Sequence, residues 1–349
     1  MPSNGTIATV APVSGATITV CVPVYNVERY LCECLDSIFS QDYADFDVVL
    51  VDDGSTDSSG AICDEYVARY PQRALVVHKD NEGLLLARRS GFALAAGDYV
   101  MCVDSDDALV PGALASVAAT VAETSADVVR FGFTREESKA VPVDSSIPFK
   151  LYSAEEKPSM LRALCCSTSG SENPMCFKAI RRSCIGADVD FSEFKGLTFA
   201  EDFLQTLTVY DRAQTFCFID ASLYYYRPGS GITRAYDPHF YCDVCRCLNV
   251  AEGFVRRWER EYGCNDLMVG LAACRLDSGA QYAEWMALQG DTVGLDDLLA
   301  SHDFERCLTT SGAGKLLRFD RRLVLWALRW RTYQIIAGIA IARAAKARR

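Results

Sequence analysis

Three aspartates stand within four positions, at Asp104, Asp106 and Asp107, with no lysine or arginine beside them. The apolar residues directly before them, Tyr99–Val103, predict a buried strand. In an Asp-x-Asp pair that continues an extended backbone, both carboxylates project to the same side. Their natural counter-ion is a hard divalent cation, which usually keeps a phosphate as a further ligand. The alternative interpretation is an acidic turn or helix N-cap ahead of Pro111.

Two more predicted strands also end in polar residues. Ile18–Val24 is followed by Tyr25, and Phe46–Val51 is followed by Asp52 and Asp53. Apolar residues at three- and four-residue spacing predict helices over residues 30–39, 61–70 and 83–95, and a third strand lies at 74–77. This alternation is typical of an α/β protein with a doubly wound sheet and helices on both faces.

Such a sheet would gather the polar strand ends at one edge, because its ligands bind outside the carboxyl ends of the strands. The ring of Tyr25 could lie against a base, and a carboxylate of Asp52 or Asp53 could accept a base N–H. The paired Asp104 and Asp106 could hold a metal for a diphosphate. The sequence therefore predicts a nucleotide site at this edge.

These segments, in this order, resemble glycosyltransferase family 2, a large group of inverting transferases with the GT-A fold. The matching segments are Val22-Pro23-Val24-Tyr25-Asn26, Val51-Asp52-Asp53-Gly54-Ser55-Thr56-Asp57, Asn81-Glu82-Gly83-Leu84 with Ala87-Arg88 and Gly91, and Gly97-Asp98-Tyr99 leading into Asp104-Ser105-Asp106-Asp107. The resemblance is close over residues 18–133 and looser to about 233. The looser part contains Phe199-Ala200-Glu201-Asp202, Tyr224-Tyr225-Tyr226-Arg227 and Ser230-Gly231-Ile232-Thr233.

The resemblance implies a nucleotide-sugar site built from residues of the first half. It places Pro23 and Tyr25 against the base and Asp53 on the base N–H, with Asp52 supporting the same loop. Arg88 would reach the nucleotide or its phosphates, a task that suits a guanidinium group, although an exposed helix arginine is the alternative.

The resemblance also implies the catalytic and metal groups. Asp106 would be the direct ligand of a divalent metal, Mn²⁺ or Mg²⁺, and Asp104 would contact the ribose or the metal. Asp202, with Glu201 beside it at the start of a predicted helix, would be the general base, whereas a carboxylate there is otherwise often only a dipole partner. His239 is either a further metal or diphosphate contact or a surface histidine that precedes a helix.

The function so implied is an inverting, metal-dependent glycosyltransferase. It would move a sugar from a nucleotide-sugar donor, with uracil as the expected base, to a hydroxyl of a glycan or lipid-linked acceptor, in cell-surface polysaccharide or glycolipid synthesis. Two alternatives stay open: a non-catalytic nucleotide-sugar-binding scaffold, and a sugar nucleotidyltransferase. The latter needs a glycine-rich basic phosphate loop after the first strand, which Val24–Glu28 does not provide.

We predict four regions. Residues 1–17 form a flexible lead-in without the pattern of a secretory signal, and residues 18–235 form the GT-A domain, with a nucleotide-binding half, 18–133, and an acceptor half, 134–235. A short strand is expected at 174–178 in the acceptor half. Residues 236–314 form a helical accessory region, with helices over 244–258, 267–276 and 282–288, and residues 315–349 form a basic amphipathic tail.

Charge separates the tail from the rest of the chain. Residues 315–349 contain ten Lys/Arg against Asp320, a net of +9, so the other 314 residues carry −11 − 9 = −20. An acidic body argues against nucleic acid as a partner. The tail, with Trp326, Trp330, Ile335, Ile336, Ile339 and Ile341, is too interrupted to span a bilayer, and it favours binding to an anionic membrane surface. The alternative is a terminal helix packed on the domain.

The expected location is therefore cytoplasmic, peripheral on the inner face of the membrane. The sixteen cysteines fit that location as reduced thiols, because several lie in apolar strand-like segments. Cys242, Cys245 and Cys247 lack a second ligand pair at zinc-site spacing.

Overall fold

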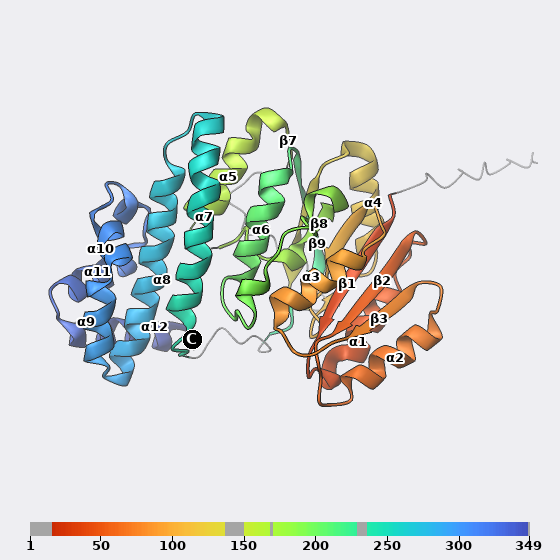
Figure 1. Cartoon of the computed structure of the whole chain (residues 1–349), viewed down its shortest axis with the longest axis horizontal. Helices are drawn as coiled ribbons and strands as arrows, with labels where there is room; N and C mark the ends of the chain where they lie inside the picture. The colour runs from red at the N-terminus through yellow and green to blue at the C-terminus, as the bar shows by residue number, and fades with distance from the viewer. Residues whose placement is uncertain (1–15, 137–149, 168–169, 229–235, 348–349) are drawn as a thin grey trace, which may run out of the picture.

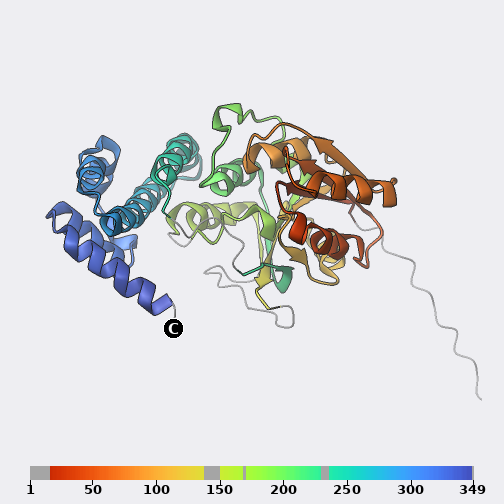
Figure 2. The same cartoon turned by 90° about the horizontal axis from the view of Figure 1, so that it is seen from below.

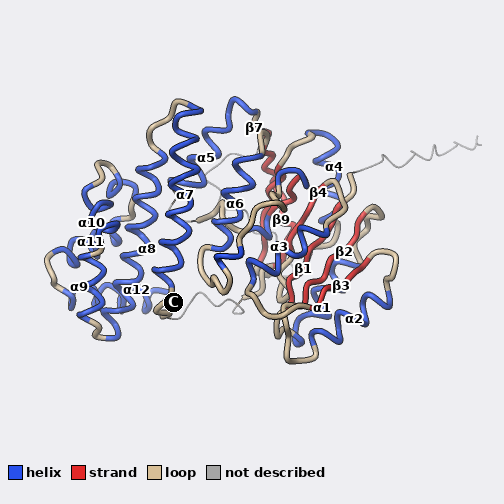
Figure 3. Tube along the Cα trace, viewed as in Figure 1, coloured by secondary structure: helices blue, strands red, loops and turns tan. Residues whose placement is uncertain are grey.

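A computed structural model describes residues 16–136, 150–167, 170–228 and 236–347 (Figure 1). The molecule is elongated, with an α/β part made by the first two thirds of the chain and a helical part beside it. Figure 3 shows that all described strands lie in the α/β part. This agrees with the predicted order of an α/β sheet followed by a mostly helical region.

Residues 18–102 form a parallel part of one nine-stranded sheet. The strands of this part are β1 (Ile18–Val24), β2 (Phe46–Asp52), β3 (Ala74–His78) and β4 (Tyr99–Cys102). The strand β1 lies between β2 and β4 and pairs parallel with both, while β3 extends the sheet beyond β2. Because these strands run in one direction, their carboxyl ends share an edge, which carries the predicted polar residues.

The remaining strands complete the sheet in the order β3-β2-β1-β4-β8-β6-β9-β5, with β7 also paired to β9. Their bounds are β5 (Ala108–Leu109), β6 (Val128–Thr134), β7 (Leu151–Tyr152), β8 (Lys178–Arg181) and β9 (Phe216–Tyr225). The strand predicted at 174–178 is wrong in place: Met175–Phe177 form a 3-10 turn, and β8 begins only at Lys178. The carbonyls before this turn bind the Lys178 side chain and are therefore not free for a strand ladder.

Helices cover both faces of the sheet, as predicted. Side chains of β1 alternate between two apolar cores, with Val20 and Val22 in one and Cys21 in the other. The first core is closed by α1 (Glu28–Phe39), α2 (Ser59–Arg69) and α4 (Ala113–Thr124). The second is closed by α3 (Leu84–Leu94), α5 (Lys157–Cys166), α6 (Glu201–Arg212) and α7 (Phe240–Tyr262).

The C-terminal helices, blue in Figure 2, form a separate group, and a third apolar core holds them together. It is built by α8 (Leu267–Gln289), α9 (Thr292–Ala300), α10 (His302–Thr309), α11 (Phe319–Arg329) and α12 (Tyr333–Ala347). The helices predicted at 267–276 and 282–288 are one continuous helix, α8. Ile336 of α12 is fully buried in this core, so the expectation that it faces a membrane is wrong. Among the described residues, no helix is long and apolar enough to cross a membrane.

Candidate active site

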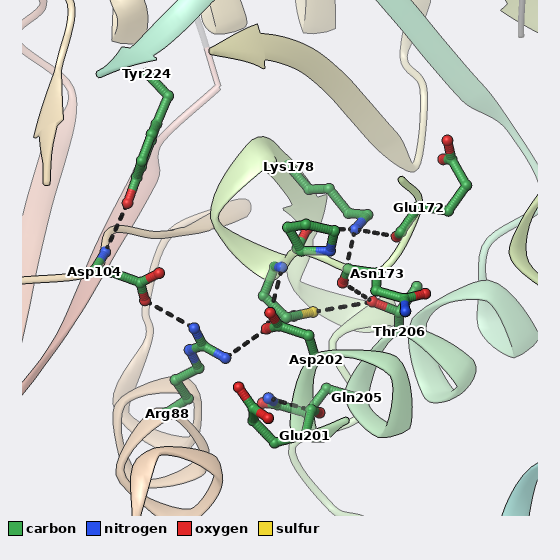
Figure 4. A network of polar contacts seen from close by, with 12 residues as sticks. Arg88, Asp104, Glu172, Asn173, Lys178, Glu201, Asp202, Gln205, Thr206 and Tyr224 are labelled. Carbon is green, nitrogen blue, oxygen red and sulfur yellow. Dashed lines mark hydrogen bonds and ion pairs between the residues drawn. The ribbon is translucent and has the colours of Figure 1, made fainter. Parts of the chain in front are cut away.

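The side chain of Arg88, on α3, joins two carboxylates that are far apart in the sequence (Figure 4). Its Nη1 donates to Oδ1 of Asp202 at 2.6 Å, and its Nη2 donates to Oδ1 of Asp104 at 2.8 Å. The guanidinium is only 1% exposed, whereas the carboxylates are 25–27% exposed. The structure thus brings Arg88, Asp104 and Asp202 together at the carboxyl edge of the sheet, with Arg88 behind the two acids.

Asp53 fixes the start of the helix that carries Arg88. Its carboxylate accepts hydrogen bonds from the N–H groups of Glu82 and Gly83 and from Nζ of Lys79. Gly83, with φ of 94°, directly precedes α3. Three donors use most of the roughly four acceptor positions of a carboxylate, and Asp53 is buried. The observed role of Asp53 is therefore structural, and its contact with a base stays a prediction.

Asp52 holds the neighbouring turn. It accepts a hydrogen bond from the N–H of Ser55, and its Oδ2 lies 2.8 Å from Nδ1 of His78. Burial acts to raise the pKa of Asp52, but hydrogen bonds from Ser55 and His78 outweigh it and lower that pKa. The second ring nitrogen of His78 lies 3.1 Å from Oδ1 of Asp64. Asp52 thus holds the turn after β2, and its part in a nucleotide-binding loop stays a prediction.

The His78 contacts predict a pH-dependent contribution to stability. Hydrogen bonds to Asp52 and then Asp64 raise the pKa of His78 above its ordinary value of 6.5. Its stabilisation is therefore fully present below pH 6.5 and is lost as the pH rises through the raised pKa. We expect the difference in the free energy of unfolding between wild type and His78→Gln, measured with urea from pH 5.5 to 9, to be largest at the acid end. His302→Gln is the control, because that side chain is 90% exposed; a difference for His78→Gln that did not change with pH would contradict the prediction.

The two residues expected against the base differ in exposure. Tyr25 follows β1 and is 51% exposed, so its ring is available to a ligand. Pro23 is buried inside β1, opposite Val51 of β2. Only the former presents a free side-chain surface, and the base contact of either residue stays a prediction.

The acidic turn after β4 contains two kinds of carboxylate. Asp106 is half-buried, and among the described residues no hydrogen bond or ion pair reaches its carboxylate. Asp104 binds Arg88 through Oδ1, and its Oδ2 likewise has no partner among those residues. Free carboxylate oxygens suit Mg²⁺ or Mn²⁺, so these two residues fit a divalent cation that takes its other ligands from a diphosphate and water. Within the described ranges, no group of three or more His, Cys, Asp or Glu side chains could hold a metal by itself.

Asp107, by contrast, is part of the scaffold, and the sequence analysis assigned it no role. It is buried, accepts a hydrogen bond from the hydroxyl of Tyr224 at 2.8 Å, and accepts another from the N–H of Arg227. The same hydroxyl accepts the N–H of Asp104 at 3.1 Å, and Nε of Arg227 donates to the carbonyl of Asp106. Burial, together with the Asp104 and Asp106 charges, raises the pKa of Asp107 to about 7.

The Glu-Asp pair opens α6, after a strained residue. Ala200 has φ of 64°, a left-handed conformation that is uncommon for residues other than glycine. Asp202 uses Oδ1 for Arg88 and for a long contact, 3.4 Å, with the N–H of Met175, and Oδ2 has no partner among the described residues. Burial and the Asp202 charge raise the pKa of Glu201. The free Oδ2 could take a proton from a ligand.

Behind Asp202 lies a buried polar network that the sequence analysis also missed (Figure 4). Lys178 donates from Nζ to three backbone carbonyls, and burial lowers its pKa to about 8. Glu172 forms an ion pair with Arg130 at 3.1 Å and accepts a hydrogen bond from Tyr210. A charged residue inside the apolar segment Met175–Ile180 was the available sequence signal.

Three further predictions concern His239, the segment Ser230–Thr233 and a cysteine cluster. His239 is exposed and directly precedes α7, as its alternative interpretation expected, and its possible contact with a metal or diphosphate stays a prediction. The segment Ser230–Thr233 lies outside the described residues. Cys242, Cys245 and Cys247 are free thiols, as are the other cysteines.

Comparison with known families gives this site its context. The model of the family described as "Glycosyl transferase family 2" matches residues 19–186, which include Arg88, Asp104 and Asp106. The chain therefore contains a glycosyltransferase family 2 domain. The prediction from the motifs is confirmed, and the sheet described above is the GT-A fold expected of that family.

Curated relatives of this family 2 domain occur in several bacteria. The chain is 45% identical to glycosyltransferase GlyA of Streptococcus pneumoniae over 111 residues, which are 32% of the chain and 16% of GlyA. It is 29% identical to the uncharacterized glycosyltransferase EpsJ of Bacillus subtilis over 212 residues, 60% of each protein. The chain thus covers less than two thirds of these relatives.

A solved structure resembles the chain beyond the residues that match the family model. The crystal structure of residues 1–349 of TarS from S. aureus has a TM-score of 0.65 and 20% identity, over 95% of this chain and 92% of that one. TarS, in full a poly(ribitol-phosphate) β-N-acetylglucosaminyltransferase, was also solved with UDP and with UDP-GlcNAc. At this identity, the likeness shows that the fold is shared.

Proposed function

We propose that this protein is an inverting, metal-dependent glycosyltransferase that moves a sugar from a UDP-sugar to an acceptor hydroxyl. The observation that carries the proposal is that one buried guanidinium, that of Arg88, forms ion pairs with both Asp104 and Asp202. A scaffold that only bound nucleotides would not need the second carboxylate at that position. The retained Asp202 therefore favours catalysis over the scaffold alternative.

The geometry suggests how this chain would act on its substrates. Oδ1 of Asp202 is held by Arg88, so Oδ2 can accept the proton of the attacking hydroxyl. Attack on the face of the sugar opposite the departing diphosphate inverts the anomeric centre and needs no covalent nucleophile. A divalent cation bound by Asp106 and Asp104 would supply charge neutralisation at the diphosphate. Arg88 keeps the proton acceptor and the donor-side carboxylate in one fixed arrangement.

The choice of UDP-GlcNAc as the first donor to test rests on the comparison with TarS. That protein binds UDP and UDP-GlcNAc in its solved structures, and its name specifies a poly(ribitol-phosphate) acceptor. We therefore propose a hydroxyl-rich cell-envelope polymer or a lipid-linked glycan as the acceptor here. This agrees with the predicted role in cell-surface polysaccharide or glycolipid synthesis.

The direct test is a panel of nucleotide sugars, UDP-GlcNAc included, incubated with the full chain with and without Mn²⁺. Release of nucleoside diphosphate measures turnover with water as acceptor, and thermal stabilisation measures binding. Mn²⁺-dependent release from a UDP-sugar supports the proposal. Stabilisation by UDP-sugars without any release, with water or with added poly(ribitol-phosphate), would support the scaffold alternative instead.

We also propose that the tail holds the enzyme on the inner face of the cytoplasmic membrane. Its helices are docked on α8, with Arg343 bound to Glu284 at 2.6 Å, yet aromatic side chains of α11 and of the residue directly after it are exposed. Phe319, Trp326 and Trp330 are 49–73% exposed and recur at helical spacing. Exposed aromatic groups flanked by arginines suit the interface of an anionic membrane, where each basic residue adds about 1 kcal/mol.

The membrane prediction is tested by replacing only exposed side chains, because truncation would remove buried residues of the third core. We expect Trp326→Ser/Trp330→Ser to lose most of its flotation with phosphatidylglycerol vesicles at low salt, with an unchanged melting temperature. The matched control is Leu288→Ser/Val293→Ser, two exposed apolar residues elsewhere in the helical part. If the Trp326→Ser/Trp330→Ser variant floated with the vesicles as well as the control variant did, the proposed membrane contact of the tail would be wrong.

A further inference from the structure

The segment Glu172–Met175, here called the 172–175 loop, turns its carbonyl groups inward onto Lys178. Nζ of Lys178 donates to the carbonyl oxygens of Glu172 at 2.7 Å, Asn173 at 3.3 Å and Pro174 at 2.5 Å. An ammonium group has three N–H donors, so three consecutive carbonyls use all of them. Lys178 is 1% exposed, which means that the protein alone satisfies this cation.

The 172–175 loop contacts the proposed base directly and through α6 (Figure 4). The N–H of Met175 points at Oδ1 of Asp202 at 3.4 Å. Oγ1 of Thr206, one turn along α6 from Asp202, donates to the carbonyl of Asn173 at 2.8 Å. The carbonyl of Asn173 therefore receives donors from both Lys178 and α6, and the loop is held between them.

Among the described residues, Lys178 forms no ion pair. The Glu172 carboxylate is near enough for its charge to act on Lys178, but it binds Arg130 and Tyr210, and the hydrogen-bond partners of Lys178 are three neutral carbonyls. Burying an ammonium group is costly, and an apolar side chain of similar volume often serves stability as well or better. A lysine at this position therefore suggests a role other than stability. The part of the structure that it holds directly is the 172–175 loop.

We propose that Lys178 is a positioning residue for sugar transfer. It fixes the 172–175 loop, and the Met175 N–H of that loop, together with Arg88, orients the Asp202 carboxylate toward the acceptor. This inference rests on the proposed role of Asp202 as the base. Because a displacement of reacting groups by about 1 Å can cost about 10²-fold in rate, a loosened loop lowers turnover even when the donor still binds.

The first test compares two buried lysines. Lys157 is also 1% exposed, and its Nζ donates to the carbonyl of Asp211 at 2.9 Å, at the far end of α6. We expect Lys178→Met to lower kcat for UDP release from UDP-GlcNAc with Mn²⁺ by about 10-fold or more, with the donor KM within about twofold of wild type. Lys157→Met should destabilise the fold comparably while kcat changes little. Equal losses of kcat in the two variants, or a raised donor KM alone, would overturn the proposal.

A second pair of variants, with smaller changes, tests the proposal even if a lysine variant does not fold. Thr206→Val removes only the hydroxyl that donates a hydrogen bond to the carbonyl of Asn173. Thr208→Val changes a buried threonine on a different face of α6, near Gly186. We expect Thr206→Val to lower kcat several-fold and Thr208→Val to leave it near wild type. Unchanged kcat in Thr206→Val would contradict control of Asp202 by the loop.

Hydrogen exchange of the Met175 amide separates failure of this inference from failure of the proposed function. The amide should exchange faster in Lys178→Met than in wild type or Lys157→Met, whether or not any nucleotide sugar is turned over. If no donor is turned over, the function proposed above fails and faster exchange still supports the loop contact. If turnover is present but exchange at Met175 is unchanged, Lys178 does not fix the loop.

Discussion

Asp202→Asn is expected to lower turnover by about 10²-fold or more while leaving donor binding nearly unchanged. The amide keeps the size of the side chain, and its oxygen can still accept from Arg88. It cannot accept a proton from the attacking hydroxyl at Oδ2. Since the proposal places Asp104, and not Asp202, on the donor side, the thermal stabilisation by UDP should persist.

The neighbouring Glu201 provides the control for this assignment. Its pKa is raised by burial and by the Asp202 charge, so it could itself hold a proton at neutral pH. We expect Glu201→Gln to cost less turnover than Asp202→Asn, because no contact of its carboxylate with the Arg88 guanidinium is observed among the described residues. A larger loss in Glu201→Gln would move the base role to Glu201, and lost UDP binding in Asp202→Asn would make Asp202 a donor residue.

The sheet could be predicted because each element is encoded locally. The strands β1, β2 and β4 are short apolar segments, and their bounds agree with the predicted ones to within one residue. The acidic residues at the strand ends also follow from chain order, since parallel strands must present their carboxyl ends together. Local pattern therefore predicts that these acidic residues share one edge of the sheet, which is where the candidate site lies.

The partners of those residues could not be predicted, because they come from distant parts of the chain. Arg88 and Asp202 are 114 positions apart, and nothing near Arg88 in the sequence indicates that its guanidinium is committed to carboxylates. Asp53 binds Gly83, 30 positions on, instead of remaining free. The partners of Lys178 could not be predicted either, because they are backbone carbonyls, which every residue has.

Asp106→Ala is expected to abolish transfer and to remove the Mn²⁺-dependent part of nucleotide binding. The carboxylate of Asp106 makes no hydrogen bond or ion pair with other described residues, so its loss should cost the fold little. Without it, Asp104 alone remains of the proposed pair, and one of its oxygens is already bound to Arg88. The measurement is the melting temperature with UDP, with UDP and Mn²⁺, and with neither, alongside UDP release from UDP-GlcNAc.

Asp107→Ala makes the matched comparison, because the two aspartates are adjacent but differ in their contacts. Asp107 is buried and binds Tyr224 and Arg227, so its removal leaves buried donors unsatisfied and should destabilise the fold by about 1–3 kcal/mol without Mn²⁺ or UDP present. Asp106→Ala should instead melt like wild type and lose only the increment that Mn²⁺ adds. If Asp106→Ala kept that increment and near wild-type turnover in chelator-treated buffer, metal-dependent transfer would be wrong. Asp106 would then be only an acidic turn residue.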